Sequence, residues 1–331
     1  MRVAVMGAGS WGTTVACLAS RNCSTTLWAR RNDIAEEVSK AHTNERYLPG
    51  FALPHSLSAS ADLEEVVRDA DVLVIAVPSH GFRETLLSLR SYVRPWIPIV
   101  SLTKGLEEGS LLRMTEIVAE VLPGHPAGVL TGPNLAKEIM SGQAAASVIG
   151  MEDLVVAEAL QGVFAGELYR VYTNHDVIGC EVGGALKNVI AIASGIAEAI
   201  SVGDNTRSMV MTRGLAELTH LGVAMGAEPA TLSGLAGMGD LLATCMSPHS
   251  RNRHVGEQLG RGRKIEEVIA DMNMVAEGVK TAASVVDLAG RHGIEMPIAE
   301  EMYAVLYQGR AAADAYRGLQ QRKAGHERDS G

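Results

Sequence analysis

The sequence predicts an α/β protein in which a doubly wound parallel sheet is followed by an all-α C-terminal domain. In the first half, short runs rich in Val and Ile alternate with helix-like segments, as expected for strands buried on both faces. After residue 175 the strand-like runs stop and Ala-rich helical patterns replace them. The 331 residues also suffice for two domains of ordinary size.

The strand-like runs are short and continuous, and helix-like segments such as 61–70 and 110–122 lie between them. Repeated strand–helix–strand units predict a parallel sheet with helices on both faces. The strands are expected at 2–7, 25–30, 71–78, 97–103, 127–133 and 145–150, and the helices of the second half at 177–200, 206–225, 264–270, 278–292 and 297–308. We therefore expect domains at 1–175 and 176–321, and a polar tail at 322–331.

Charge and cysteine content exclude several classes of protein. The net charge of −9 argues against a general nucleic-acid binder, which usually carries a basic field. A few local cations can still bind an anionic ligand. The four cysteines have no metal-site spacing and the histidines are scattered, so no metal site is predicted.

The most apolar stretch, 182–200, contains Lys187, Asn188 and Glu198. Three polar side chains make it a poor membrane span and a good buried helix. The N-terminus enters a strand-like run directly, without a signal-peptide pattern. We expect a cytoplasmic protein.

The motif "GAGSWG" follows the first predicted strand and opens a helix. Gly7 permits a tight turn, Gly9 lets backbone approach a pyrophosphate, and Gly12 lets the helix pack closely on the strand. The free N–H groups of the helix start bind the anion. This context predicts a Rossmann-type dinucleotide site; a glycine-rich turn without a ligand is the alternative.

The second predicted strand ends in "LWARRND", where an NAD-binding domain usually carries an acid. Arg30 and Arg31 would suit the 2′-phosphate of NADP, because guanidinium groups bind phosphate through forked, charge-assisted hydrogen bonds. Asp33 could still serve NAD. We expect a preference for NADPH; a solvated basic turn is the alternative.

Further candidates follow the carboxyl ends of other predicted strands, where open α/β sheets bind ligands. Lys104 follows the strand at 97–103, and "TGPNLAKE" places Asn134 and Ala136 at a helix start. A lysine in a surface loop is the alternative for Lys104.

In the second half, Lys187 lies in an apolar helical stretch, where a charged amine costs free energy unless it has a partner or a purpose. Asp240 stands alone among small and apolar residues. Lys187 could instead be structural, either extending its amine to water or pairing with Glu181.

The run "SPHSRNRHVG" clusters Ser250, Arg251 and Asn252, whose hydroxyl, guanidinium and amide groups could bind a phosphate. A solvated loop is the alternative. Glu277 precedes Gly278 and could be an ordinary helix-start carboxylate.

Together these stretches resemble NAD(P)-dependent glycerol-3-phosphate dehydrogenase of the bacterial, cytosolic type, over almost the whole chain. The resemblance rests on several motifs in the family's order: "GAGSWGT", "NERYLPG", "AVPSH", "TKGLE", "TGPNLAKE", "GGALKNVIAI", "TRGLAE", "GMGDLLATC", "SRNR" and "EGVKTA".

The resemblance implies a role for each matching residue. Lys187 would be the catalytic proton donor and acceptor. The substrate contacts would be Lys104, Asn188, Asp240, Thr244, Ser250, Arg251 and Asn252. The NADP or NAD contacts would be Gly7, Gly9, Ser10, Trp11, Gly12, Arg30, Arg31, Lys104, Gly132, Asn134, Ala136, Arg251, Val275 and Glu277. The family's usual assembly, a homodimer, is implied in the same way.

The implied reaction is the reversible reduction of dihydroxyacetone phosphate to sn-glycerol 3-phosphate, which supplies phospholipid synthesis. Two alternatives remain. One is a two-domain dehydrogenase of β-hydroxy acids, which also places a lysine on a helix of its second domain. The other is a dinucleotide-binding redox sensor that catalyses nothing.

Overall fold

The computed structural model describes residues 1–272 and 276–321. The chain divides into two compact units: Unit 1 contains Met1–Thr103 and Leu112–Val177, and unit 2 contains Lys104–Leu111 and the chain from Ile178 onward. The main division follows Val177, whereas the predicted boundary followed residue 175. The structure also corrects the assignment of Lys104–Leu111, expected in the first domain, because Leu106 and Leu111 are buried in the core of unit 2. The predicted tail at 322–331 lies outside the described residues.

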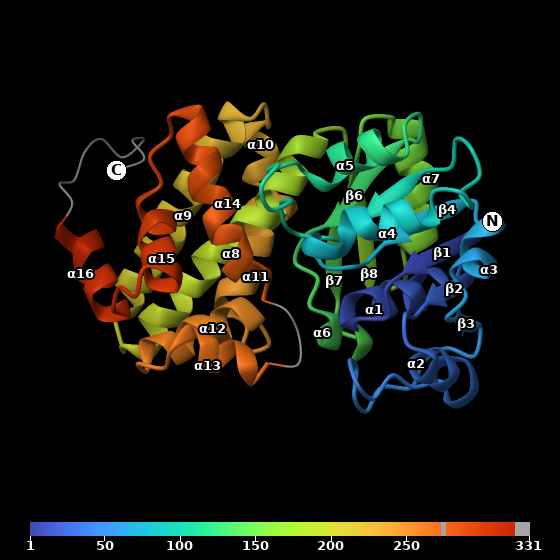
Figure 1. Cartoon of the computed structure of the whole chain (residues 1–331), viewed down its shortest axis with the longest axis horizontal. Coiled ribbons are helices and arrows are strands. Elements are labelled where there is room, and N and C mark those ends of the chain that lie inside the picture. Colours follow the sequence, from blue (N-terminus) through green and yellow to red (C-terminus); the bar gives the residue numbers. More distant parts are fainter. Residues whose placement is uncertain (273–275, 322–331) are drawn as a thin grey trace. The chain divides into compact units, whose positions relative to one another are not determined.

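Unit 1 is built on one eight-stranded sheet with the order β3-β2-β1-β4-β5-β6-β7-β8 (Figure 1). The first six strands have the order of a doubly wound dinucleotide-binding sheet, whose ligand crevice lies between β1 and β4. The strands are β1 (Arg2–Met6), β2 (Ser24–Trp28), β3 (Leu57–Ser60), β4 (Val72–Ile75), β5 (Ile99–Ser101), β6 (Ala127–Thr131), β7 (Ala145–Met151) and β8 (Tyr169–Asn174).

Alternate residues of the central strands enter two separate cores. Val3 and Val5 of β1 pack in one core, while Ala4 and Met6 pack in the other. Successive side chains of a strand point to opposite faces, so both faces of the sheet are covered. The covering helical segments are α1 (Ser10–Ala19), α2 (Asn32–Glu36), η1 (Glu37–Ala41), α3 (Leu63–Arg68), η2 (Ser79–Gly81), α4 (Phe82–Leu89), α5 (Met114–Val121), α6 (Ala136–Met140) and α7 (Leu154–Phe164).

The predicted fold class is confirmed, with two differences in detail. Strand β7 pairs antiparallel with β6, whereas a fully parallel sheet was expected. The short helix α6 leaves little chain for a crossover, so β7 returns alongside β6 in the opposite direction. Strands β3 and β8 were not among the predicted strands; the sequence of β3, "LSAS", has no apolar run.

In the part of the chain that the structure describes, unit 2 is entirely helical (Figure 1). Its helical segments are α8 (Val177–Ala199), α9 (Asp204–Ala224), α10 (Pro229–Leu232), η3 (Leu235–Gly239), α11 (Asp240–Met246), α12 (Arg251–Gly260), α13 (Ile265–Ala270), α14 (Glu277–His292), α15 (Pro297–Tyr307) and α16 (Ala312–Gln321). Among the described residues, only α8 has the length and composition of a membrane span, and 94% of its apolar window is buried inside the protein. Helix α8 is therefore the core helix of unit 2.

Two glycines let α8 and α12 approach closely. A Cβ on Gly195 would lie 2.0 Å from the carbonyl oxygen of Arg253, and a Cβ on Gly256 would lie 2.0 Å from that of Ile192. Both distances are far below contact, so larger residues would force the helices apart. This spacing brings residues of α8 and α12 within hydrogen-bond distance.

We expect Gly256→Ala to lower the free energy of unfolding by about 3 kcal/mol, because the added methyl overpacks a fixed helix contact. Gly290→Ala in α14 is the matched control, since no atom lies within 4 Å of its Cβ position. That control should instead stabilise the protein by up to about 1 kcal/mol. Urea unfolding of both variants measures the difference, and equal midpoints would contradict the prediction.

Candidate active site

The three glycines of the loop between β1 and α1 differ in the space around them. Gly7 has φ +121°, and a Cβ there would lie 2.7 Å from the carbonyl oxygen of Ala76. A Cβ on Gly12 would lie 2.0 Å from the carbonyl oxygen of Gly7. At Gly9, in contrast, no atom lies within 4 Å of the Cβ position. Backbone is therefore packed tightly at the first and third glycines and accessible at the second.

Helix α1 begins at this opening, where the N–H groups of a first turn have no acceptor within their own helix. Gly9 is the N-cap, so no side chain caps the helix, and the first turn contains no acidic residue. Such a terminus attracts an anion. The loop and helix start therefore fit the pyrophosphate of a dinucleotide.

The two residues after Gly9 face different surroundings. The Ser10 hydroxyl donates a hydrogen bond to the carbonyl oxygen of Tyr47 at 2.6 Å. The ring of Trp11 is partly buried against the core beneath α1, and its Nε1–H is buried without a partner among the described residues. An indole N–H left unpaired in this way can donate to a ligand.

The arginines after β2 are both exposed, but they differ in their contacts. Arg31 Nε donates to Asp33 Oδ1 at 3.0 Å, so this guanidinium is paired within its own turn. Arg30 lies beside this pair. Arg31 would have to break this ion pair before binding a ligand phosphate, whereas Arg30 has no ion pair with a described residue.

The end of β6 supplies the other predicted cofactor residues of unit 1. Gly132 has φ +124°, which favours glycine. Asn134 Nδ2 lies 3.4 Å from Ser147 Oγ, and Ala136 is the first residue of α6. Val275, predicted at the same site, lies outside the described residues.

In unit 2 the structure brings Lys104, Lys187 and Thr244 around the carboxylate of Asp240. Lys104 Nζ lies 2.7 Å from Asp240 Oδ2, and Lys187 Nζ lies 3.0 Å from Asp240 Oδ1. Lys187 Nζ also donates to Thr244 Oγ1. The alternative pairing of Lys187 with Glu181 is therefore wrong, and Lys104 is not a solvated surface lysine.

Helix geometry aligns the acceptors of Lys187. Asp240 and Thr244 are four residues apart on α11, so both point to one face of that helix. The Thr244 hydroxyl donates back to the carbonyl oxygen of Asp240 at 2.6 Å, which directs its lone pairs toward Lys187. The ammonium is thus held by two oxygens of one helix, and only 4% of Lys187 is exposed.

The cluster, called here the ammonium cluster (Lys104, Lys187, Asp240 and Thr244), carries two potential positive charges and one negative charge. Its excess of positive charge suits an anionic ligand. Burial lowers the pKa of Lys104 to about 8, although the neighbouring carboxylate of Asp240 acts in the opposite direction. The charge of Lys104 is therefore sensitive to pH near neutrality.

The run "SRNR" is the start of helix α12, and the solvated-loop alternative is wrong. Ser250 is the N-cap, and its Oγ accepts a hydrogen bond from the N–H of Arg253 at 3.2 Å. Arg253 turns inward, with Nε 2.9 Å from Glu257 Oε1. Ser250 and Asn252 are buried, whereas Arg251 is exposed. Arg251 is therefore the member of this run most accessible to a ligand.

A chain of amide hydrogen bonds joins α12 to the ammonium cluster. Asn252 Nδ2 donates to Asn188 Oδ1 at 2.8 Å, and Asn188 Nδ2 donates to the carbonyl oxygen of Lys104 at 3.1 Å. Asn252 Oδ1 accepts from the N–H of Gly278 at 2.9 Å. A Cβ on Gly278 would lie 2.6 Å from the carbonyl oxygen of Asn188, so only glycine fits at this second position of α14. Both asparagines thus fix backbone positions around the site.

Glu277, the first residue of α14, acts electrostatically on the guanidinium of Arg251. The carboxylate and the guanidinium therefore belong to one neighbourhood of unit 2. No group of three or more metal-ligating side chains occurs in residues 1–272 and 276–321.

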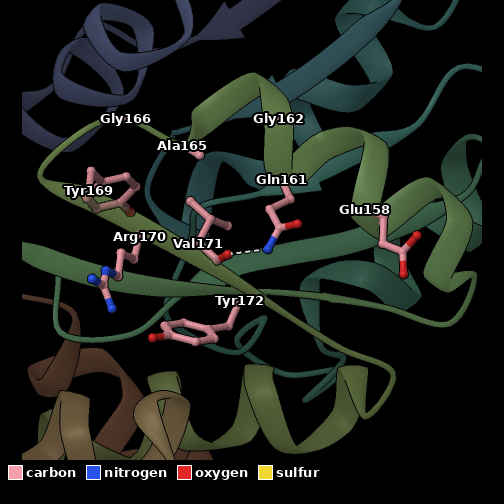
Figure 2. Close-up of a pocket in the computed structure, with 9 residues that line it drawn as sticks. All are labelled: Glu158, Gln161, Gly162, Ala165, Gly166, Tyr169, Arg170, Val171 and Tyr172. Atoms are coloured by element: carbon pink, nitrogen blue, oxygen red, sulfur yellow. Dashed lines mark hydrogen bonds between the residues drawn. The ribbon is translucent and has the colours of Figure 1, made fainter.

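A separate hollow of about 560 Å³ lies along α7 and β8 of unit 1 (Figure 2). Gln161 Nε2 donates across it to the carbonyl oxygen of Val171 at 2.5 Å, which covers a backbone acceptor of the edge strand β8. The hollow contains none of the predicted site residues; it is lined by Glu158, Gln161, Gly162, Ala165, Gly166, Tyr169, Arg170, Val171 and Tyr172.

Comparisons with known proteins match both units. Residues 2–157 match the family described as NAD-dependent glycerol-3-phosphate dehydrogenase N-terminus, and residues 176–317 match the corresponding C-terminus. A protein of Sphingopyxis alaskensis named glycerol-3-phosphate dehydrogenase [NAD(P)+] 2 is 58% identical over 331 residues, which cover 100% of this chain and 99% of the relative.

The chain belongs to the NAD(P)-dependent glycerol-3-phosphate dehydrogenase family. Another member of the family, from Mycobacterium avium, is 52% identical over 98% of this chain and 96% of its own length. The crystal structure of glycerol-3-phosphate dehydrogenase from Coxiella burnetii has a TM-score of 0.93 and 35% identity, covering 97% of this chain and 99% of that one.

More distant structures share the fold of this glycerol-3-phosphate dehydrogenase family. A ketopantoate reductase from Ralstonia eutropha has a TM-score of 0.61 at 17% identity over 96% of this chain and all of its own. This similarity at low sequence identity concerns the fold alone. The substrate therefore has to be inferred from the residues of the site.

Proposed function

We propose that this chain catalyses the reversible reduction of dihydroxyacetone phosphate to sn-glycerol 3-phosphate, with Lys187 as proton donor and acceptor. The observation that carries the proposal is the buried ammonium of Lys187, held by Asp240 and Thr244. A bound NAD(P)H would supply the hydride that adds to carbonyl carbon C2. Membership of the family supports both the reaction and the cofactor.

Lys187 would stabilise the negative charge that develops on the carbonyl oxygen and would then protonate it. A preorganised cation in a site that excludes water stabilises such an oxyanion strongly. Asp240 orients the ammonium, and Thr244 limits its movement. In the reverse direction the neutral amine of Lys187 would accept the hydroxyl proton of the product.

Arg251 and Lys104 would bind the substrate phosphate, because Arg251 is exposed and Lys104 belongs to the ammonium cluster, whose charge favours an anion. Asn188 and Asn252 would support the substrate site mainly by fixing the backbone positions of Lys104 and Gly278. Ser250 retains a hydroxyl hydrogen that could be donated to the phosphate, although its oxygen caps α12. The phosphate would serve as a binding handle that positions the carbonyl.

The residues of unit 1 would hold the dinucleotide. The pyrophosphate would lie against Gly7, Gly9, Gly12 and the N–H groups of Ser10 and Trp11. The remaining contacts would come from Arg30, Arg31, Gly132, Asn134 and Ala136. The family resemblance also implies cofactor contacts for Lys104, Arg251 and Glu277. We infer a cofactor-binding unit and a substrate-binding unit.

We further propose that NADPH is preferred over NADH, because Arg30 is exposed and its neighbour Arg31 already has an anionic partner. Arg30→Ala should raise the KM for NADPH about tenfold, the loss expected for one charge-assisted phosphate contact, and leave that for NADH within about twofold. Initial rates with each cofactor measure this. Equal Michaelis constants for NADH and NADPH in the wild type would show that Arg30 and Arg31 do not select the cofactor.

The KM for dihydroxyacetone phosphate should rise as pH increases above about 8, the pKa of Lys104. Lys104 is charged below that pH and neutral above it, so the attraction to the phosphate is lost on the alkaline side. We expect a rise of about tenfold by pH 9.5. Lys104→Arg, which stays charged at every accessible pH, should remove the rise; a wild-type KM independent of pH would contradict the role.

One spectrophotometric assay tests the reaction itself. Dihydroxyacetone phosphate should oxidise NADPH rapidly, whereas hydroxyisobutyrate and 6-phosphogluconate should not reduce NADP+. Turnover of a β-hydroxy acid in place of the phosphotriose would favour the alternative dehydrogenase. NADPH binding without turnover of any ketone would favour a redox sensor.

Three broader properties are proposed from the family resemblance. The chain would act in the cytoplasm, would supply glycerol 3-phosphate for phospholipid synthesis, and would form a homodimer. Sedimentation at micromolar concentration tests the assembly.

A further inference from the structure

The segment between η1 and β3 contains a fully buried asparagine for which the proposed roles give no function. Asn44 has an exposed fraction of 0%. It begins the motif "NERYLPG", which belongs to the family pattern but contributes no residue to the predicted site. Its side chain packs against the glycine loop, within unit 1.

Both hydrogen bonds from its amide nitrogen go to the glycine loop and its helix. Asn44 Nδ2 donates to the carbonyl oxygen of Ala8 at 3.0 Å and to Thr13 Oγ1 at 2.9 Å. Ala8 lies between the first two glycines, and Thr13 lies in the first turn of α1. A carbonyl oxygen only accepts hydrogen bonds, so the contact with Ala8 fixes which end of the amide points toward the loop.

The donors of Asn44 thus determine how the loop presents its own N–H groups. The Ala8 carbonyl accepts from Asn44, while Thr13 N–H donates to the carbonyl oxygen of Gly9 at 2.9 Å. One side chain therefore ties the turn before α1 to the first turn of α1. A second link, from Ser10 Oγ to the carbonyl oxygen of Tyr47 at 2.6 Å, joins the same two segments.

The other end of the Asn44 amide has no comparable function. Its Oδ1 is buried and has no hydrogen-bond partner among the described residues. A buried polar atom without a partner is unfavourable, so the side chain is not optimised for packing alone. The value of asparagine at this position lies in its two donors.

We propose that Asn44 is a positioning residue for the dinucleotide, which holds the backbone of Ala8–Thr13 in the conformation that binds the pyrophosphate. This inference rests on the proposed function of unit 1. Asn44 does not itself contact the cofactor; it acts through the carbonyl of Ala8 and the hydroxyl of Thr13. Its loss should therefore weaken dinucleotide binding more than it affects the substrate.

Asn44→Asp is the sharpest test, because the shape of the side chain is kept while both donors are lost. Asn22→Asp, at an exposed asparagine of unit 1, is the control for the loss of two amide donors: Asn22 Nδ2 donates to the backbone carbonyls of Val163 and Ala165 at 3.0 and 2.8 Å. These carbonyls belong to the α7 end and not to the glycine loop.

The readouts are the Kd for NADPH from fluorescence titration and the amide hydrogen exchange of residues 8–13 in the cofactor-free protein. We expect Asn44→Asp to raise the Kd at least about tenfold and to accelerate exchange in this segment, with the KM for dihydroxyacetone phosphate within about twofold of wild type. Asn22→Asp should change thermal stability without changing the Kd. If Asn44→Asp does not fold, Asn44→Ser, which keeps one donor, should give an intermediate Kd.

Two results would overturn the positioning role: NADPH binding within twofold of wild type in the Asn44 variants, or an equal loss of binding in Asn22→Asp. Failure of the wild-type protein to bind NADPH would instead overturn the proposed function of unit 1 and this inference with it.

Discussion

Lys187→Met should lower kcat by at least about 10²-fold, the loss expected when a positioned acid–base group is removed. Methionine is unbranched and apolar like the lysine stem, so it should fill the same space in α8. Lys104 remains paired with Asp240 at 2.7 Å, and the carboxylate is not left alone. The loss should therefore come from the missing proton and cation rather than from a collapsed site.

Steady-state kinetics and NADPH titration of the same preparation test this role. The Kd for NADPH should stay near the wild-type value, while kcat falls. Lys280→Met, which alters an exposed lysine of α14, is the control and should retain full activity. Turnover by Lys187→Met within a few-fold of wild type would exclude Lys187 as the proton donor.

Arg251→Ala should lower kcat/KM for dihydroxyacetone phosphate by about 10²-fold, because a forked contact between guanidinium and phosphate combines two charge-assisted hydrogen bonds. Arg251 is the exposed residue at the start of α12, whereas Ser250 and Asn252 are buried beside it. The effect should fall mainly on KM, since the phosphate lies away from the reacting carbonyl.

Unphosphorylated dihydroxyacetone supplies the internal control for Arg251. The wild type should turn it over very poorly, and Arg251→Ala should not reduce that rate further, because there is no phosphate contact to lose. Arg261→Ala, at the opposite and exposed end of α12, should leave both substrates unaffected. Efficient wild-type turnover of the free ketone, or an equal loss with both substrates, would contradict a phosphate-binding role.

Local patterns were sufficient for most of the sheet. Runs such as "VLVI" at β4 are short, continuous and rich in β-branched residues, and each predicted strand run overlaps a strand of the structure. The pattern failed at β3, whose residues "LSAS" are small and polar and are held by pairing with β2. It also could not give the direction of β7, which depends on the partner strand.

The start of α12 shows a second limit of local patterns. From "SPHSRNRHVG" alone, a phosphate-binding cluster and a solvated loop were both open. The structure places Ser250 at the N-cap, turns Arg253 inward toward Glu257, and leaves Arg251 exposed. Neighbours in sequence thus acquire different roles because successive residues of a helix point in different directions.

The sequence by itself was sufficient to predict the glycine loop, because a strand, a tight turn and a helix start each leave a pattern within a few residues. It also marked Lys187 as unusual, since an amine in an apolar helix requires compensation. Only the tertiary structure decided what compensates it: Asp240 and Thr244 come from a helix more than fifty residues further along the chain. Such pairings depend on which helices approach each other. A Cβ on Gly183 of α8 would lie 2.6 Å from the carbonyl oxygen of Ala236, shortly before α11, so the missing side chain allows this backbone contact.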